Sequence, residues 1–366
     1  MNAERWVRSA MCWLLVSLGF AAGCGYAEPY IAVQTGLKCS QCHVNPTGGG
    51  LRGAYGDVFA QTLLPATKID TGPDLWTGDV SKFLRIGGDL RTEALATEVP
   101  HSKTISQFEV EQMRVYLEAE VIPERLLVYA DEQVAPGGAL NREAYALYWS
   151  AGHDWYVKAG QMYLPFGWRF QDQSAFVLQA TGINMTTPDQ GVEFGWLRGH
   201  WDAQLDVSNG TAGGVVTDSR KEFTTQLVYV ESVWRTGVAA NYNDKLGGGR
   251  GTYGVFGGLR TGPISWLGEA DVIDDKSLGF GQGRMLATLV EANWLIARGN
   301  NLKITGEYLD PNRAVQNNGE TRWSVVYELT PIQFAQLRAG VRYYDGIPQS
   351  NTENTRQYFI ELHGFF

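Results

Sequence analysis

From residue 83 to the C-terminus, the sequence alternates apolar and polar side chains with a period of two. In one such segment, apolar residues alternate with Asp202, Gln204 and Asp206. This pattern predicts β-strands with one apolar and one polar face. A soluble sandwich would bury its apolar faces in a core. Here many of these faces end in Trp, Tyr or Phe, which is typical of a band that faces lipid.

The alternating segments predict sixteen strands, an even number as expected for an outer-membrane barrel. Their lengths suit strands that cross a bilayer at a tilt. Short turns alternate with longer connections, which places both ends of the barrel on the periplasmic side. The fold class is therefore all-β, a 16-stranded antiparallel transmembrane β-barrel over residues 83–366. The predicted strands lie near 83–95, 110–121, 125–134, 142–151, 155–162, 190–197, 200–208, 223–232, 234–243, 251–260, 264–273, 284–297, 301–310, 321–330, 334–344 and 356–366.

The N-terminus is typical of a signal peptide spanning residues 1–27. Two arginines precede an apolar core at 10–22, which is too short for a comfortable membrane span. Cleavage after Ala27 is favoured over cleavage before Cys24, where the lipoprotein box is imperfect. After residue 22 no run of 18 apolar residues follows, so an exported chain of this kind can span a membrane only as a closed barrel.

Residues 39–43 read Cys-Ser-Gln-Cys-His, the attachment signature of c-type haem. Cys39 and Cys42 can each form a thioether with a haem vinyl group, and His43 then becomes the proximal axial ligand of the iron. The alternatives are a redox or structural disulfide, or half of a zinc site. A zinc site would need a second ligand pair, and no other cysteine follows residue 27.

Residues 28–82 therefore form a predicted monohaem cytochrome c-like segment, or plug, ahead of the barrel. A segment of this size is marginal as an independent core, and one covalent haem c and packing against the barrel would stabilise it. The second axial ligand is expected to be His or Met. We favour His363, which points inward on the final strand. The other candidates are Met162, Met185, His153, His200 and His101.

The inward faces of the predicted strands carry charges of both signs, which indicates a solvated lumen that is mixed to acidic. A phosphate-selective porin would need a basic lumen. Separately, the net charge of −9 argues against nucleic acid as a partner. The connection 163–189 is long enough either to fold into the lumen or to lie on the surface. The inward charges are Arg85, Arg91, Glu93, Arg114, Glu118, Glu120, Asp131, Lys158, Glu193, Asp206, Arg235, Glu269, Glu291, Glu307, Glu328, Arg342 and Glu361.

The sequence resembles the fused outer-membrane monohaem cytochrome–porins, a family whose known members oxidise extracellular ferrous iron. The likeness is densest over residues 28–59, which include Ala-Val-Gln-Thr-Gly at 32–36 and the haem motif at 39–43, followed by Pro46, Leu51 and Gly56. Over the barrel the resemblance is one of architecture. It implies a monohaem segment docked in or under a sixteen-stranded barrel.

Three functions follow as hypotheses. The first is an electron conduit of the bacterial outer membrane, in contact with lipid. Its haem, in the lumen or on the periplasmic side, would link periplasmic electron carriers to an extracellular redox substrate such as Fe(II). The direction of electron flow stays open. The second is a diffusion porin whose haem segment is vestigial or a gate. The third is an enzyme, an Fe(II) oxidase or one that acts on a small molecule at an open iron position.

Overall fold

The computed structural model describes residues 28–72, 74–278 and 283–366. The predicted signal peptide, residues 1–27, lies outside the described residues together with both of its candidate cleavage points. Sixteen antiparallel strands form a closed barrel, because β17 pairs with β2 and β9 pairs with β10 in an otherwise sequential ring. All sixteen predicted strands are confirmed, and so is the fold class.

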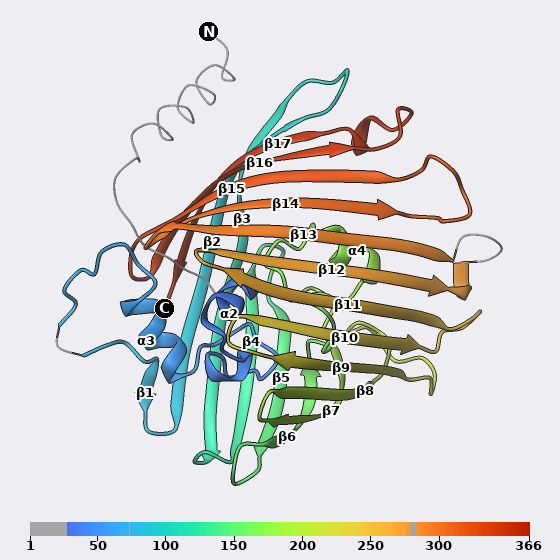
Figure 1. Ribbon diagram of the computed structural model, residues 1–366. Coiled ribbons are helices and arrows are strands. Elements are labelled where there is room, and N and C mark those ends of the chain that lie inside the picture. The colour runs from blue at the N-terminus through green and yellow to red at the C-terminus, as the bar shows by residue number, and fades with distance from the viewer. Residues whose placement is uncertain (1–27, 73, 279–282) are drawn as a thin grey trace.

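The largest difference from the predicted boundaries is β3, which begins at Ile105 instead of near residue 110. The short turns lie at the end of the barrel where the C-terminus is found, and the long connections lie at the other end (Figure 1). The strands of the ring are β2 (Leu84–Glu98), β3 (Ile105–Ile122), β4 (Leu126–Ala135), β5 (Leu140–Trp149), β6 (Trp155–Met162), β7 (Asp189–Arg198), β8 (Trp201–Ser208), β9 (Glu222–Val230), β10 (Trp234–Asn243), β11 (Arg250–Thr261), β12 (Ile264–Asp275), β13 (Arg284–Ala297), β14 (Asn300–Asp310), β15 (Glu320–Ile332), β16 (Ala335–Asp345) and β17 (Arg356–Phe365).

The outer face of the barrel is apolar and carries aromatic side chains near both ends of the strands. This arrangement matches a lipid-facing band between two aromatic girdles. Exposed tryptophans near the short turns are Trp155, Trp196, Trp201, Trp234, Trp266 and Trp294. Exposed aromatic residues near the long connections are Phe108, Phe223, Tyr242, Tyr253, Tyr308, Trp323 and Tyr343.

The inner face is polar, and each of the seventeen charged residues predicted to point inward is buried or half-buried. Many form ion pairs along the wall. Lys158 Nζ lies 3.0 Å from Glu193 Oε1, and Arg338 Nη1 lies 2.8 Å from Glu361 Oε2. Buried charges of this kind are tolerated where a partner compensates for lost water. The predicted mixed-charge lumen is therefore observed, although much of it is filled.

The N-terminal segment (residues 28–82) has little regular structure. It contains helix α2 (Pro29–Thr35), the single 3₁₀ turn η1 (Cys39–Gln41), helix α3 (Ala54–Thr62) and the short strand β1 (Asp79–Ser81), which pairs with β2. None of the helices among the described residues is long and apolar enough to cross a membrane. Figure 1 shows this segment, drawn in blue, at the short-turn end of the barrel and in its interior.

Candidate cofactor site

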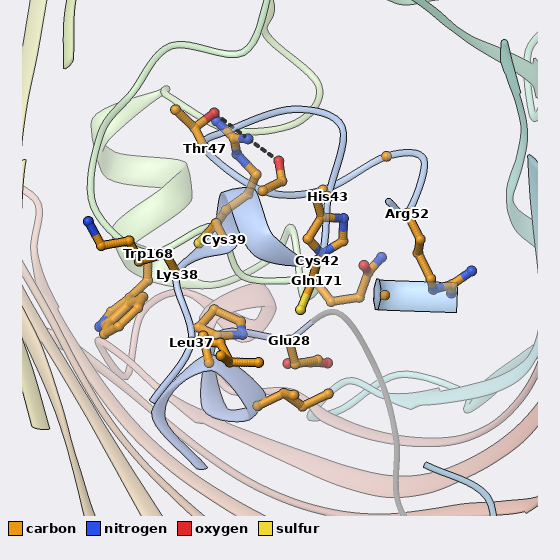
Figure 2. A pocket seen from close by; sticks show the side chains of 18 of the residues that line it. Glu28, Leu37, Lys38, Cys39, Cys42, His43, Thr47, Arg52, Trp168 and Gln171 are labelled. Carbon is orange, nitrogen blue, oxygen red and sulfur yellow. Dashed lines mark hydrogen bonds between the residues drawn. The ribbon is translucent and has the colours of Figure 1, made fainter. Parts of the chain in front are cut away.

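The two cysteines and the histidine of the motif lie on one helical turn. The backbone N–H groups of Cys42 and His43 both donate to the Cys39 carbonyl, at 3.1 and 3.0 Å. The Gln41 side-chain oxygen accepts the Lys38 N–H at 2.9 Å and closes the start of the turn. Residues three and four positions apart share one face of such a turn. The local fold therefore presents both thiols and the imidazole toward the same space (Figure 2).

A tight loop supports His43 from behind. Gly48, Gly49 and Gly50 all adopt positive φ angles of 91°, 85° and 64°, which glycine tolerates at no steric cost. At Gly50 there is also no room for a side chain, because a Cβ atom would lie 2.2 Å from the hydroxyl oxygen of Tyr129. That hydroxyl accepts the Leu51 N–H at 3.0 Å. The three glycines therefore form a tight turn that packs against the barrel wall at Tyr129.

The loop is also held by a buried polar network. The Asn45 amide nitrogen donates to both carboxylate oxygens of Glu143, at 2.8 and 3.1 Å, and Lys158 Nζ lies 3.4 Å from the Asn45 oxygen. All three side chains are fully buried. Each is a long-range contact from the loop to the barrel wall, so the wall fixes the position of the haem motif.

The rest of the segment is bound to other strands of the wall. Lys38 Nζ donates to the Trp201 carbonyl at 2.9 Å and pairs with Asp202. Arg235 Nη2 donates to the Leu37 carbonyl at 2.7 Å. On α3, Asp57 Oδ2 lies 2.9 Å from Arg85 Nη2. Contacts made by residues 37–57 of the segment therefore reach both sides of the barrel.

The connection 163–188, called the inward loop below, folds into the lumen. The sequence left open whether this connection folds into the lumen or lies on the surface, and the structure shows that it folds into the lumen. Phe166, Trp168 and Phe170 are buried in one apolar cluster with Tyr30 and Val33 of α2. The loop also contains helix α4 (Phe176–Thr181), which packs against β12, β13 and β14.

The inward loop meets the N-terminal segment directly. Arg169 Nη1 donates to Thr47 Oγ1 at 3.0 Å and to the Gly48 carbonyl. The Met185 sulfur lies 3.9 Å from the position of a Cβ atom on Gly49. The segment from one end and the loop from the other therefore fill much of the lumen between them.

A cavity remains between these two parts, with about 1620 Å³ of empty space including its open mouths. Cys39, Cys42 and His43 line it, together with α2, the inward loop and parts of the barrel wall. Among the described residues, no group of three or more His, Cys, Asp or Glu side chains is placed to hold a bare metal ion. A haem iron takes four ligands from its porphyrin, so the protein needs to supply only the axial ligands.

The chemistry of the donors fits a c-type haem. Burial, followed by the nearby charges of Arg52 and Arg169, lowers the pKa of His43 to about 4, so the imidazole is neutral and able to bind iron. Its Nδ1 atom is buried without a hydrogen-bond partner among the described residues.

The cysteines are free and do not form a disulfide with each other. Burial raises the pKa of the Cys39 thiol, and burial with the nearby Cys39 raises the pKa of Cys42 to about 11. Reactive redox cysteines instead have lowered pKa values. The arrangement therefore lacks the lowered thiol pKa that marks a reactive redox cysteine.

Of the six candidates for the second axial ligand, two line the same cavity as His43. They are His363 on β17 and Met185 on the inward loop. The Nε2 atom of His363 lies 2.5 Å from Asp89 Oδ2, a carboxylate contact of the kind that orients ligand histidines. Met162 is buried in a separate cluster. The remaining candidates, His101, His153 and His200, are exposed. The assignment of His363 stays a prediction.

Sequence reasoning did not identify Asn45, Arg169 or Tyr129 as parts of this site. They become neighbours of the haem motif only through contacts between residues 78 to 122 positions apart. One local signal was available, because three successive glycines indicate a backbone that must take unusual angles or approach another group closely.

Neither a protein-family model nor a curated protein sequence matches the chain. Several solved outer-membrane proteins are similar to it in structure. OprB of Pseudomonas putida aligns with a TM-score of 0.63 at 9% identity, covering 78% of this chain and 94% of that one. The anion-selective porin of Comamonas acidovorans gives 0.60 at 10% identity, covering 77% and 99%. The DcaP channel of Acinetobacter baumannii gives 0.57 at 14% identity, covering 83% and 100%. The chain therefore has the fold of the outer-membrane porins and channels.

Proposed function

We propose that the protein is an electron conduit of the bacterial outer membrane. One covalent haem c on Cys39 and Cys42, with His43 as axial ligand, would exchange electrons between periplasmic carriers and an extracellular donor or acceptor. Fe(II) is the donor suggested by the resemblance described above. The observation that carries the proposal is the position of the motif. It faces a cavity inside a closed barrel, with the N-terminal segment on one side and the inward loop on the other.

A bound haem c would supply a one-electron iron couple in the interior of the barrel. The chain's own residues would hold that couple in place. Cys39 and Cys42 would fix the ring and His43 would bind the iron, while the hydrogen bond from Leu51 to Tyr129 would hold the loop at residues 44–51 in place. Buried aromatic residues of the inward loop would keep bulk water out from the long-loop end.

Position matters because the apolar band of such a barrel is roughly 25 Å tall. A single redox centre can connect the two sides only from within the lumen. Contacts such as Asn45 with Glu143 and Lys158 hold the motif against the inner wall. This location supports a conduit over a cytochrome that is merely tethered below the barrel.

A diffusion porin with a gating or vestigial haem segment is the second candidate. The observation that favours it is the likeness to porins and channels, which extends over at least 77% of the chain in each of the structures named above. The filled lumen argues against free passage of solutes unless the segment or the loop moves. Planar-bilayer conductance separates the two: a conduit gives small or no currents, whereas a porin gives large, steady ones.

The proposal is tested with protein produced alongside an intact haem-attachment system and reconstituted in vesicles. Oxidised cytochrome c is placed inside and a membrane-impermeant reductant outside. We expect two results: a Soret band that survives denaturation of the protein, and reduction of the internal cytochrome c by the external reductant. Cys39→Ala combined with Cys42→Ala should abolish both. His43→Ala, which retains both cysteines, should keep the haem but change its spectrum and slow the transfer.

Absence of a covalent Soret band in the unaltered protein would overturn the proposal. So would a haem-loaded barrel that exchanges no electrons across the vesicle wall with any external donor or acceptor. A five-coordinate iron that binds small molecules would favour an enzyme over a conduit.

A further inference from the structure

We propose that Arg52 and Arg114 bind the two propionate carboxylates of the haem, so that the haem lies across the lumen from one wall to the opposite wall. This inference rests on the proposed function, since it presupposes a bound haem c. It concerns which residues of this chain hold the end of the cofactor that the Cys-x-x-Cys-His motif does not reach.

The cavity runs across the barrel between two opposite walls. In the ring, eight strands run from β10 to β17 and eight from β2 to β9, so the β9–β10 seam lies opposite the β17–β2 seam. Lining residues of the cavity come from both seams. Arg235 and Val230 belong to the first, and Asp89 and His363 belong to the second. A flat ligand can therefore extend from one seam to the other.

The attachment cysteine Cys39 lies beside the wall at the β9–β10 seam. Its neighbour Lys38 is bound to β8 through Trp201 and Asp202. Arg235 on β10 donates to the carbonyl of Leu37. The thioether edge of the haem is therefore anchored beside the β9–β10 seam. The propionates project from the edge of a porphyrin that is remote from its vinyl groups. This directs them toward the wall at the β17–β2 seam.

Arg52 belongs to the N-terminal segment, where its backbone pairs with that of His43, and its side chain reaches the wall at the β17–β2 seam. Its guanidinium carbon lies 4.6 Å from the ring centroid of Phe365 on β17, and the residue lines the cavity. In the described part of the chain no carboxylate lies within 4.0 Å of it. Asp57 interacts with it electrostatically but is itself paired with Arg85, whose terminal nitrogen lies 2.9 Å from its carboxylate. A guanidinium that lines a cavity and makes no close ion pair of its own suits a carboxylate ligand.

Arg114 on β3 supplies the second donor. This residue is buried, with a relative exposure of 3%, and it lines the same cavity. One of its terminal nitrogens is occupied by Asp131 at 3.1 Å and Tyr163 at 2.7 Å, whereas its Nε atom is buried without a partner. A buried donor of this kind costs free energy if it stays unpaired. The neighbouring Arg91 is less suited, because Asp89 and Glu361 lie 3.2 and 3.5 Å from it.

The test uses full-length haem-loaded protein and compares Arg52→Gln, Arg52→Lys and Arg114→Lys with the unaltered chain. Loss of the Arg52 charge should lower the midpoint potential, because a nearby cation favours the ferrous state. We expect the oxidised-to-reduced ratio at fixed potential to rise about threefold to tenfold, where tenfold corresponds to about 59 mV for a one-electron couple. The propionate bending band in the resonance Raman spectrum should shift in each variant. Arg52→Lys should restore the potential but not the band.

Arg260→Gln is the matched control. Arg260 also holds the N-terminal segment, by donating to the Gln34 carbonyl at 2.8 Å, but it lies outside the set of residues that line the cavity. It should leave the potential and the band unchanged. If Arg52→Gln and Arg260→Gln behave alike, or if the band is unmoved in Arg52→Gln, the propionate assignment is wrong while the conduit stands. A chain without covalent haem would instead overturn the proposed function itself.

Discussion

The barrel wall and the N-terminal segment are stabilised in different ways. Each wall strand is bound to two neighbours by backbone ladders, interrupted by a few bulges, and its side chains largely alternate between the two faces. The segment has two short helices, one helical turn and a three-residue strand, and side chains of the wall hold it in place. The wall should therefore fold without the segment, whereas the segment should depend on the wall. Four predictions test this comparison.

The largest effect is expected from deletion of residues 28–82. The sixteen-stranded ring should still form, because its strands bind one another, and the lumen should open. Heat-modifiable migration in detergent gels would report the folded barrel, and single-channel conductance in planar bilayers should rise markedly. Residues 28–82 produced alone should be largely unfolded by circular dichroism, as expected for so small a core. A barrel that fails to form after the deletion would reverse the comparison.

A charge on the outer wall should produce the next largest effect. Val290 lies in the middle of β13, and its side chain is 59% exposed on the apolar face. Val290→Arg should destabilise the barrel by about 2–4 kcal/mol, as for charges near a bilayer midplane. Urea unfolding in lipid vesicles measures the change. Leu246→Arg, in the long connection between β10 and β11, is the control and should have little effect.

A smaller effect, confined to the segment, is expected at Gly56. A Cβ atom there would lie 2.2 Å from the Cys42 carbonyl oxygen, so Gly56→Ala should cost about 1–3 kcal/mol through overpacking. The barrel ring should be unaffected. Limited proteolysis of residues 28–82 in the folded protein measures the local loss. Gly53→Ala, whose Cβ would meet nothing closer than 3.9 Å, should be far better tolerated.

The smallest effect is expected at Ser265 on β12. Its hydroxyl donates to the Gln34 side-chain oxygen at 2.8 Å, one of many contacts between segment and wall. Ser265→Ala should cost about 1 kcal/mol, seen in the same proteolysis assay. A double-mutant cycle with Gln34→Ala isolates the interaction. A coupling near zero would show that this contact does not help to hold the segment.

This difference also explains what the sequence could predict. Strand positions follow from the alternation of apolar and polar side chains, a pattern formed by residues that are close in the sequence. All sixteen strands were therefore predictable, with errors in their boundaries such as the start of β3 at Ile105. The Cys-x-x-Cys-His turn is equally local. The strand β1, the helices α2 and α4 and the inward position of residues 163–188 were not predictable from such patterns, because they depend on packing inside a barrel that must form first.

The candidate site divides along the same line. Cys39, Cys42 and His43 were identified from five adjacent residues, and the structure brings all three to one cavity. The residues around them come from distant strands. Glu143 reaches the motif loop through Asn45, and His363 and Met185 arrive from the last strand and the inward loop. No spacing within the sequence reports which of these lie together, so the distal ligand stays a prediction.

The contact between Gly50 and Tyr129 has a consequence for how this sequence can change over time. Because the tyrosine hydroxyl occupies the space where a side chain at position 50 would begin, neither residue is free to be replaced independently. Natural variants that carry any other residue at position 50 should have a smaller side chain than tyrosine at position 129. The two positions should therefore covary, although they lie 79 positions apart in the chain.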